Sequence, residues 1–421
     1  MKISIEERPI RTLQDFYDLM DQTADVRRQA VQDVLAEKEA AEKDVASLRI
    51  ALECLKNIPG SGTEKPFERC LRMDAEMEDH EVVVDLDYEI SELARDIGYL
   101  ELGEAALKFI LEGQAPGLLR QAEELAKKLS LGLFGGGLAK RLSAPPVRCF
   151  ITDRDGTVNN YCGRYRSSTQ SVYNAVFLTC FARNRTQYPI VVTSGPLAGP
   201  GLTDVSVMPP RTYVMAASKG REYIDLNNAY NSFPAPEEQS ELLRKLHRQL
   251  EDLLKQSEYR KFGLIGSGLQ VKFGQLTVAR QDISKSVPED ESRKFLETIK
   301  GLIAKHDPDE RSLRIEDTGL DIEIILTIGS GEQRKDFDKG DGVDYLDQAL
   351  GLNMAEGPHL VCGDTFSDLP MLRVTMEKCG ETQAVFVTRN KDLHKAVLEI
   401  CPGAHIVAEP DVLVLALRML S

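Results

Sequence analysis

Two aspartates, one residue apart, directly follow an apolar run in this chain. Residues 150–152 lead into Asp153 and Asp155, and a Gly-Thr pair comes next. The pattern predicts a buried strand that ends in a glycine turn, with both carboxylates outside its carboxyl end, where open parallel sheets collect their functional groups. One carboxylate can attack an electrophile while the other transfers a proton. Asp153 is therefore our candidate nucleophile, and Asp155 is our candidate general acid and base.

Two later segments offer groups that bind phosphate. Thr193 and Ser194 follow the apolar run 190–192 and precede Gly195. A hydroxyl group and backbone N–H groups at such a turn can donate hydrogen bonds to phosphate oxygens, and Thr193 is the stronger of the two hydroxyl candidates. Lys339 precedes a predicted helix, where its charge can neutralise a phosphate and keep a neighbouring carboxylate ionised.

A second acidic pair follows another apolar run. Asp364 and Asp368 come after residues 360–362. Mg²⁺ prefers oxygen ligands, and we expect Asp364, the side chain of Asp153 and the backbone carbonyl of Asp155 to bind it. Asp368 is expected to bind the ion directly or to orient those ligands. Without a cation, the carboxylates would repel one another and an approaching phosphate.

Each segment alone also fits an ordinary strand end or surface turn, but their order along the chain is more specific. The series D-x-D-G-T, Thr-Ser-Gly, Lys and G-D-x-x-x-D resembles the haloacid-dehalogenase-like phosphatases. The resemblance implies that an aspartyl-phosphate forms on Asp153 and that Mg²⁺ is the cofactor.

The elements that position these residues alternate between strands and helices from residue 147 onward, which is typical of an α/β protein with a parallel sheet. Strands are predicted over residues 147–152, 189–193, 262–265, 322–327, 359–362 and 383–387. Helices are predicted over residues 169–184, 237–256, 288–305, 340–351 and 410–420. By resemblance, a Rossmannoid haloacid-dehalogenase-like core spans 146–225 and 332–421, and an inserted α/β cap spans 226–331.

The first 145 residues are predicted to form an all-helical domain, a bundle with coiled-coil character, because apolar residues recur there at helical spacing. Its helices are expected over residues 12–57, 66–78, 88–112 and 115–131. A second D-x-D at 85–87 follows three valines, but no Gly-Thr comes after it, so we assign it to a helix start or short loop. The glycine run at 135–137 lacks the Gly-Lys-Ser/Thr of a phosphate loop and is interpreted as a linker.

Several segments resemble the trehalose-6-phosphate phosphatases, above all the nematode type with a helical N-terminal domain. These segments are T-S-G-P-L-A-G-P-G from residue 193, K-G-R-E-Y from 219, G-S-G-L-Q-V-K from 266 and D-K-G-D-G-V from 338. The resemblance implies hydrolysis of trehalose 6-phosphate to trehalose and phosphate. It also implies that the phosphorylated disaccharide contacts Gly195, Gly220, Arg221, Glu222, Gln270, Lys272 and Glu323.

Three residues depart from the family pattern. Arg154 stands between the two aspartates, where an apolar or aromatic residue is usual, and we expect its side chain to point away from Asp153. Lys219 and Tyr223 replace expected tryptophans, and the chain has no Trp at all. Sucrose phosphate or glucosylglycerol phosphate is therefore an alternative substrate. A non-catalytic regulator that senses a phosphosugar is a second alternative.

Composition argues against several other classes of protein. The net charge of −15 disfavours binding to nucleic acid. The eight cysteines include no C-x-x-C pair, which favours a reducing compartment over a disulfide framework. No apolar run reaches the roughly 18 residues that a membrane span needs. We expect a cytoplasmic protein that binds no membrane, and we hypothesise that its helical domain forms a homo-oligomer or binds a protein partner.

Overall fold

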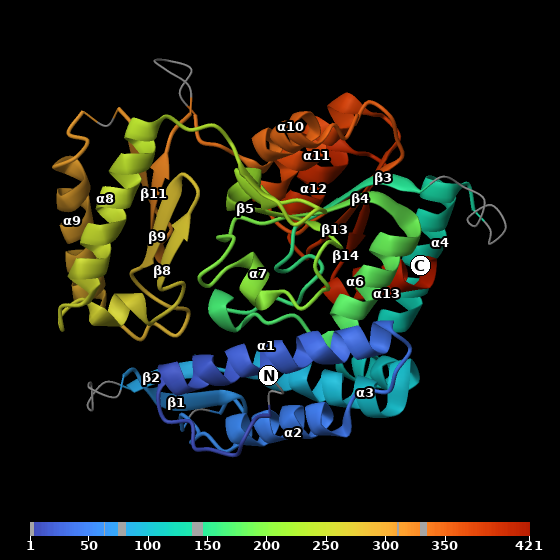
Figure 1. Ribbon diagram of the computed structural model, residues 1–421, viewed down its shortest axis with the longest axis horizontal. Coiled ribbons are helices and arrows are strands. Elements are labelled where there is room, and N and C mark those ends of the chain that lie inside the picture. The colour runs from blue at the N-terminus through green and yellow to red at the C-terminus, as the bar shows by residue number, and fades with distance from the viewer. Residues whose placement is uncertain (1–3, 63, 75–80, 137–145, 310, 329–334) are drawn as a thin grey trace.

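The computed structural model describes residues 4–62, 64–74, 81–136, 146–309, 311–328 and 335–421. Figure 1 shows a mostly helical N-terminal part, a central sheet with helices on both faces, and a smaller sheet backed by α8 and α9. The predicted α/β core with its inserted cap and preceding helical domain is confirmed. Within the described residues, no helix is both long and apolar enough to cross a membrane.

The central sheet has eight strands among the described residues, in the order β14-β13-β12-β3-β4-β5-β6-β7. The strands from β14 to β5 pair in parallel, whereas β6 and β7 pair antiparallel. The first four in chain order are β3 Val147–Thr152, β4 Thr186–Val192, β5 Val214–Ala217 and β6 Glu222–Ile224. The others are β7 Tyr230–Ser232, β12 His359–Gly363, β13 Thr382–Val387 and β14 His405–Val407.

Helices cover both faces of this sheet, so its parallel strands are buried on both sides. Phe150 faces a cluster that includes α6 and α13, whereas its neighbours Cys149 and Ile151 face a cluster that includes α10, α11 and α12. The helices are α6 Val172–Arg185, α7 Leu202–Val205, α10 Lys339–Leu350, α11 Leu369–Lys378, α12 Lys391–Ile400 and α13 Pro410–Leu420. Single 3-10 turns are η1 Tyr165–Ser167, η2 Ser218–Gly220 and η5 Phe366–Asp368.

Among its described residues, the N-terminal part has four helices and one hairpin. Its helices are α1 Leu13–Leu35, α2 Glu42–Lys56, α3 Asp87–Gln114 and α4 Leu118–Phe134. The single helix expected over 12–57 is therefore two helices. The helix expected over 66–78 is also wrong, because β1 Glu68–Arg72 pairs antiparallel with β2 Glu81–Asp85. The three valines of β2 are β-branched and alternate in burial, which favours a strand. The sequence had predicted only a helix start or short loop at the D-x-D that follows them.

The cap is a four-stranded antiparallel sheet packed on two helices. Its elements are α8 Glu237–Leu254, β8 Leu269–Lys272, β9 Gln275–Ala279, α9 Glu289–Ala304, β10 Leu313–Asp317 and β11 Asp321–Leu326. The strand predicted over 262–265 is wrong, because Arg260–Gly263 forms the 3-10 turn η3. Phe262 stacks there on Phe295 of α9, at 3.9 Å between ring centroids. A short apolar run does not distinguish a strand from a buried turn.

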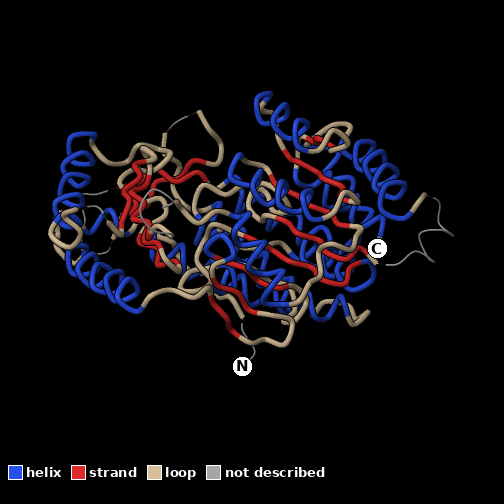
Figure 2. The backbone as a smooth tube through the Cα atoms, turned by 90° about the horizontal axis from the view of Figure 1, so that it is seen from above, coloured by secondary structure: helices blue, strands red, loops and turns tan. Residues whose placement is uncertain are grey.

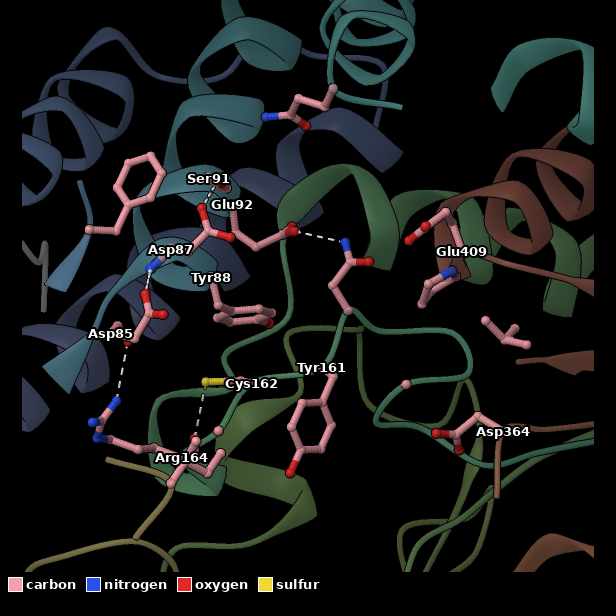
Figure 3. A pocket seen from close by; sticks show the side chains of 18 of the residues that line it. Asp85, Asp87, Tyr88, Ser91, Glu92, Tyr161, Cys162, Arg164, Asp364 and Glu409 are labelled. Atoms are coloured by element: carbon pink, nitrogen blue, oxygen red, sulfur yellow. Dashed lines mark hydrogen bonds between the residues drawn. The ribbon is translucent and has the colours of Figure 1, made fainter. Parts of the chain in front are cut away.

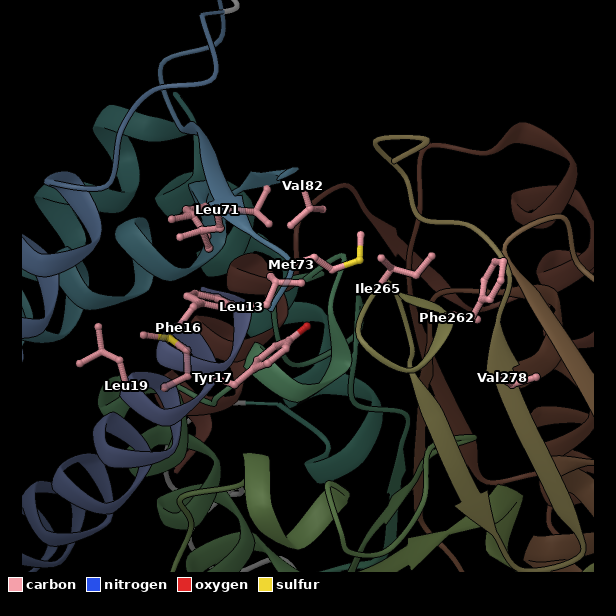
Figure 4. Packing of buried hydrophobic residues seen from close by; sticks show 14 of the residues in the cluster. Leu13, Phe16, Tyr17, Leu19, Leu71, Met73, Val82, Phe262, Ile265 and Val278 are labelled. Atoms are coloured by element: carbon pink, nitrogen blue, oxygen red, sulfur yellow. The ribbon is translucent and has the colours of Figure 1, made fainter. Parts of the chain in front are cut away.

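The N-terminal part packs against both other parts. Its helices share one apolar cluster with α6 and α13, and its hairpin side shares another with the cap. Figure 4 shows Met73 beside the hairpin and Ile265 of the cap at this second contact. Seen from above in Figure 2, the cap and the core lie side by side as two lobes. The hairpin side of the N-terminal part therefore reaches across to the cap lobe.

Two predicted domain boundaries lie at the edge of what the structure describes. The linker over 135–146 and the boundary at 331–332 fall wholly or partly outside the described residues. The boundary at 225–226 falls before β7, which still pairs with the central sheet through Ser232. The sheet thus continues past the point where we expected the cap to begin.

Candidate active site

Four chain segments meet at the carboxyl edge of the central sheet. Strand β3 pairs with β4 on one side and with β12 on the other, so the residues that follow these strands become neighbours. Asp153 follows β3, Thr193 follows β4 and Asp364 follows β12. Lys339 is the first residue of α10, and Asp338 caps that helix by accepting hydrogen bonds from Gly340 N and Asp341 N.

Lys339 bridges two buried aspartates. Its Nζ lies 2.5 Å from Asp153 Oδ1 and 2.5 Å from Asp368 Oδ1. Burial lowers the pKa of Lys339, but the charges of the two aspartates outweigh it and raise the pKa above its ordinary value. The amine therefore stays charged beside the candidate nucleophile.

The neighbouring carboxylates carry more negative charge than Lys339 can neutralise. Burial raises the pKa of Asp153 to about 7, against the attraction of Lys339. Burial and the charge of Asp153 raise the pKa of Asp364 to about 8. Thr157 Oγ1 donates to Asp364 Oδ1 at 3.0 Å and lies 3.3 Å from Asp153 Oδ2, so one hydroxyl links both carboxylates. Three carboxylates, those of Asp153, Asp364 and Asp368, therefore surround the single ammonium group of Lys339.

A divalent cation fits this arrangement. One oxygen from each of Asp153, Asp364 and Asp368 lies within 4.8 Å of the others. All three donors are carboxylate oxygens, which suit a hard cation. Burial raises the pKa values of Asp153 and Asp364, and repulsion from the neighbouring carboxylates adds to it, so a cation placed between them would stabilise their charged forms. The residues present can therefore hold a metal ion.

Asp368 is better suited to orienting its neighbours than to binding the ion itself. Asp368 Oδ1 accepts from Lys339 Nζ, and Oδ2 accepts from Asp364 N at 3.0 Å and from Thr365 N at 2.9 Å. Burial opposes its charge, but Lys339 and these backbone donors lower the pKa of Asp368. Since both of its oxygens already have protein donors, Asp368 holds Lys339 and the backbone of Asp364 in place.

The turn after Asp153 needs glycine. Gly156 has φ +85°, and a Cβ built on it would lie 2.2 Å from Asp364 Oδ2. A side chain at this position would therefore both strain the backbone and displace a candidate metal ligand.

Arg154 is buried and contacts the candidate acid. Its guanidinium pairs with Asp155 Oδ1, donates to Ser168 Oγ at 2.9 Å and also reaches the Ser168 carbonyl. The ion pair with Asp155 was not predicted from the sequence, which predicted only that the Arg154 side chain points away from Asp153. Arg154 thereby ties the turn after β3 to the loop that precedes α6.

The core and the cap both line the site. A pocket of about 250 Å³ is lined from the core by both aspartates of the D-x-D, Thr193, Gly195, Lys339 and Asp364. From the cap it is lined by Ser267, Gln270 and Lys272. Burial lowers the pKa of Lys272, while Glu323 opposes that effect. Three of the predicted substrate contacts, Gly195, Gln270 and Lys272, thus line the pocket that holds the candidate phosphate site.

The other four predicted substrate contacts lie outside this pocket. Arg221 is buried at the junction of core and cap, 3.4 Å from the carbonyls of Gly274 and Leu326 and 5.0 Å from the ring of Phe337. Glu222 accepts from Ser218 Oγ at 2.7 Å.

Two further predicted contacts also fall outside the residues that line the pocket. Gly220 packs closely on Gly342 of α10. Glu323 lies on the cap face that carries Gln270, two strands away, because both pair with Thr277 of β9. In this conformation, Gly220, Arg221 and Glu222 form a junction, and Glu323 lines none of the catalytic pocket.

A larger cavity of about 1010 Å³ adjoins the catalytic pocket. The two share Tyr161, Cys162, Gly163 and Asp364. Figure 3 shows Asp87 and Glu92 from the N-terminal part on one side of this cavity and Glu409 from the core on another. The N-terminal part therefore borders the approach to the site.

The loop between β3 and α6 contributes pocket residues that were not predicted from the sequence. Tyr161 and Tyr165 from this loop line the catalytic pocket. The loop has no regular secondary structure beyond η1, so no periodic pattern could mark which of its side chains face the site.

Two family models match the chain. The model described as "Trehalose-6-phosphate phosphatase, C-terminal" matches residues 150–413. The model described as "Trehalose-6-phosphate phosphatase N-terminal helical bundle domain" matches residues 12–109.

Curated relatives come from nematodes. An "Alpha,alpha-trehalose-phosphate synthase [UDP-forming] 2" of Aphelenchoides avenae is 34% identical over 403 residues, which cover 94% of this chain and 30% of that protein. A "Trehalose-phosphatase" of Brugia malayi is 29% identical over 422 residues, which cover 94% of this chain and 82% of that protein. A "Trehalose-phosphatase" of Caenorhabditis elegans is 35% identical and covers 62% of this chain and 61% of that protein. The chain spans about a third of the length of the synthases that it matches.

Solved structures resemble the chain more distantly. The C-terminal domain of a Candida albicans trehalose-6-phosphate phosphatase is 14% identical, with a TM-score of 0.42, and covers 72% of this chain and 95% of that one. An Aspergillus fumigatus trehalose-6-phosphate phosphatase is 15% identical, with a TM-score of 0.39, and covers 67% of this chain and 96% of that one.

Proposed function

The chain belongs to the trehalose-6-phosphate phosphatase family, and from that premise we propose that it hydrolyses trehalose 6-phosphate to trehalose and phosphate with Mg²⁺. The observation that carries the proposal is the buried Lys339 between Asp153 and Asp368, with Asp364 beside them at the carboxyl edge of the sheet. Such a group of charges can bind a phosphate ester and attack its phosphorus.

The reaction runs in two steps. In the first, Asp153 Oδ attacks phosphorus, the bond from phosphorus to the sugar oxygen breaks, and Asp155 gives a proton to that oxygen. In the second, Asp155 takes a proton from water, the water oxygen attacks phosphorus, and the aspartyl-phosphate releases phosphate and the Asp153 carboxylate. Lys339, Thr193 Oγ1 and the Gly195 N–H bind the phosphate oxygens.

Mg²⁺ would be held by the Asp153 side chain, the Asp364 side chain and the Asp155 backbone carbonyl. When bound, it offsets charge on the phosphate and on the two carboxylates. Asp368 keeps Lys339 and Asp364 in position, because both of its oxygens accept hydrogen bonds from them.

The cap supplies specificity for the sugar. Gln270 and Lys272 face the pocket and can bind sugar hydroxyls. Glu323 shares their face of the cap sheet, and we propose that it joins them when the cap closes further. For Gly220, Arg221 and Glu222 we propose a contribution at the junction of core and cap. Sucrose phosphate and glucosylglycerol phosphate stay the alternative substrates, since these cap residues decide between them.

A panel of sugar phosphates tests this function. Phosphate release from trehalose 6-phosphate is expected to exceed release from the other sugar phosphates and to stop with EDTA. Asp153→Asn is expected to lower kcat roughly a thousandfold or more, because it removes the nucleophile while keeping its shape. Asp85→Asn is the matched control, since Asp85 also follows an apolar run in a D-x-D and lies outside the catalytic pocket.

Two other results would show which part of the proposal is wrong. A preference for another sugar phosphate would keep the mechanism and revise the cap contacts. No turnover by a folded protein on any substrate would favour the phosphosugar-sensing regulator.

We also propose that the N-terminal part forms a homo-oligomer or binds a protein partner. Leu102 and Phe109 of α3 support this, because they are 73% and 81% exposed. The mass of the full chain in light scattering tests the oligomer.

A further inference from the structure

One tyrosine hydroxyl stands out in the catalytic pocket. Tyr165 lies on η1 and lines the pocket together with Asp153, Thr193 and Gly195. Its Oη is buried and has no hydrogen-bond partner within the described part of the chain. Buried hydroxyl groups normally have a partner, because leaving one unpaired costs free energy. The missing partner therefore points to a ligand.

The position of this oxygen indicates which part of a ligand it would meet. A Cβ built on Gly195 would lie 2.6 Å from Tyr165 Oη, so the hydroxyl rests directly against the Gly195 backbone. The Gly195 N–H donates to Thr193 Oγ1 at 3.1 Å. Tyr165 Oη thus lies over the segment that follows β4, which is the segment proposed to bind phosphate.

The surroundings keep the hydroxyl protonated and fixed. Burial, with a smaller contribution from the charge of Asp155, raises the pKa of Tyr165 above its ordinary value, so the phenol remains a donor. Its loop is anchored on both sides: Arg164 donates to the Asp85 carbonyl at 3.2 Å, and Arg154 holds Ser168. A donor fixed in this way costs little reorganisation when a charged oxygen arrives.

We propose that Tyr165 Oη donates a hydrogen bond to a phosphoryl oxygen of the substrate. This inference rests on the proposed phosphatase function and adds a residue to it. Tyr165 joins Lys339 and Thr193 around the phosphate, and it binds the transferred group rather than the sugar.

Tyr165→Phe removes the oxygen alone and tests the proposal. We expect kcat/KM to fall about 10- to 100-fold with both trehalose 6-phosphate and p-nitrophenyl phosphate, because both carry the phosphoryl group. Inhibition by inorganic phosphate is expected to weaken as well. The thermal unfolding temperature is expected to hold or rise, since the variant loses an unpaired buried hydroxyl.

Tyr213→Phe is the control. Tyr213 Oη donates to the Leu178 carbonyl at 3.0 Å, within the core and away from the pocket, so this variant should lose stability but keep its activity. Unchanged kinetics and phosphate inhibition in Tyr165→Phe would overturn the inference. A loss confined to trehalose 6-phosphate would also overturn it, by placing the hydroxyl on the sugar. An inactive wild-type protein would instead reject the phosphatase function itself.

Discussion

At the scale of single residues, the site is a balance of buried charges. Lys339 forms ion pairs with both Asp153 and Asp368. Burial still raises the pKa values of Asp153 and Asp364. The excess of carboxylates over cationic groups supports the proposal that this site holds a metal ion. Both oxygens of Asp368 already accept hydrogen bonds, one from Lys339 and the other from the backbone of Asp364.

Arg154 is predicted to position Asp155 for proton transfer. Arg154→Met removes the ion pair, and we expect kcat/KM for trehalose 6-phosphate to fall about 100-fold, as small misplacements of a catalytic group do. Arg154→Lys should lower kcat/KM less, because lysine keeps the positive charge beside Asp155. It cannot make both of the hydrogen bonds that Arg154 donates to Ser168, so some loss is still expected. We would measure kcat/KM, which reports the steps up to departure of the leaving group.

The same variants on p-nitrophenyl phosphate supply the control. Its phenolate leaves without a proton, so its kcat/KM should change much less than that of the sugar phosphate. Equal losses on both substrates would mean that Arg154 supports some group other than the acid.

At the scale of elements, three helices meet at one buried ion pair. Arg27 of α1 pairs with Asp96 of α3 at 2.6 Å, and Asp96 Oδ1 accepts from Val172 N at the start of α6. Tyr88 of α3 adds a second link, since it donates to the Thr169 carbonyl at 2.9 Å in the loop that carries Tyr165. The N-terminal part therefore fixes both α6 and the loop before it.

Arg27→Met is predicted to destabilise the protein in a pH-dependent way. Burial raises the pKa of Asp96 from 3.8 to about 6, against the attraction of Arg27. An acid whose pKa is higher in the folded than in the unfolded protein contributes less stability as pH rises through that range. Without Arg27 the folded pKa would rise further, so the loss should grow from pH 5 to pH 8 and reach about 3–5 kcal/mol.

Urea unfolding of both proteins at several pH values checks this. Lys255→Met removes an exposed ion pair with Asp252, and its free energy of unfolding should stay close to that of the wild type. A loss that does not change with pH would contradict the assignment of Asp96 as the titrating group.

At the scale of the whole molecule, the N-terminal part packs closely against the rest of the chain. Helix α4 packs along α13, and α1 packs along α6, within one apolar cluster. The hairpin side meets the cap near Met73 and Ile265. The N-terminal part therefore contacts both the core and the cap, whose residues line the candidate active site.

A chain that begins near Ala144 is predicted to aggregate or to lose cooperative unfolding. It would expose the faces of α6 and α13 that α1 and α4 cover in the full chain. Light scattering gives the mass of both chains, and thermal unfolding gives their cooperativity. A monodisperse, active short chain would show that the core is an independent domain.

The sequence alone determined the α/β core, the order of the candidate catalytic segments and the family. These depend on local patterns, because each candidate residue directly follows an apolar strand or begins a helix, and parallel strands bring such residues to one edge. The hairpin strand Glu81–Asp85 and the turn at Arg260–Gly263 were not predicted, because short apolar runs fit more than one structure.

The tertiary structure decided the rest. Contacts such as Arg154 with Asp155 and Ser168, or Tyr165 over Gly195, join side chains whose directions no local pattern specifies. Which predicted sugar contacts face the pocket likewise depends on how the cap docks on the core, and that docking is set by packing between segments far apart in the sequence.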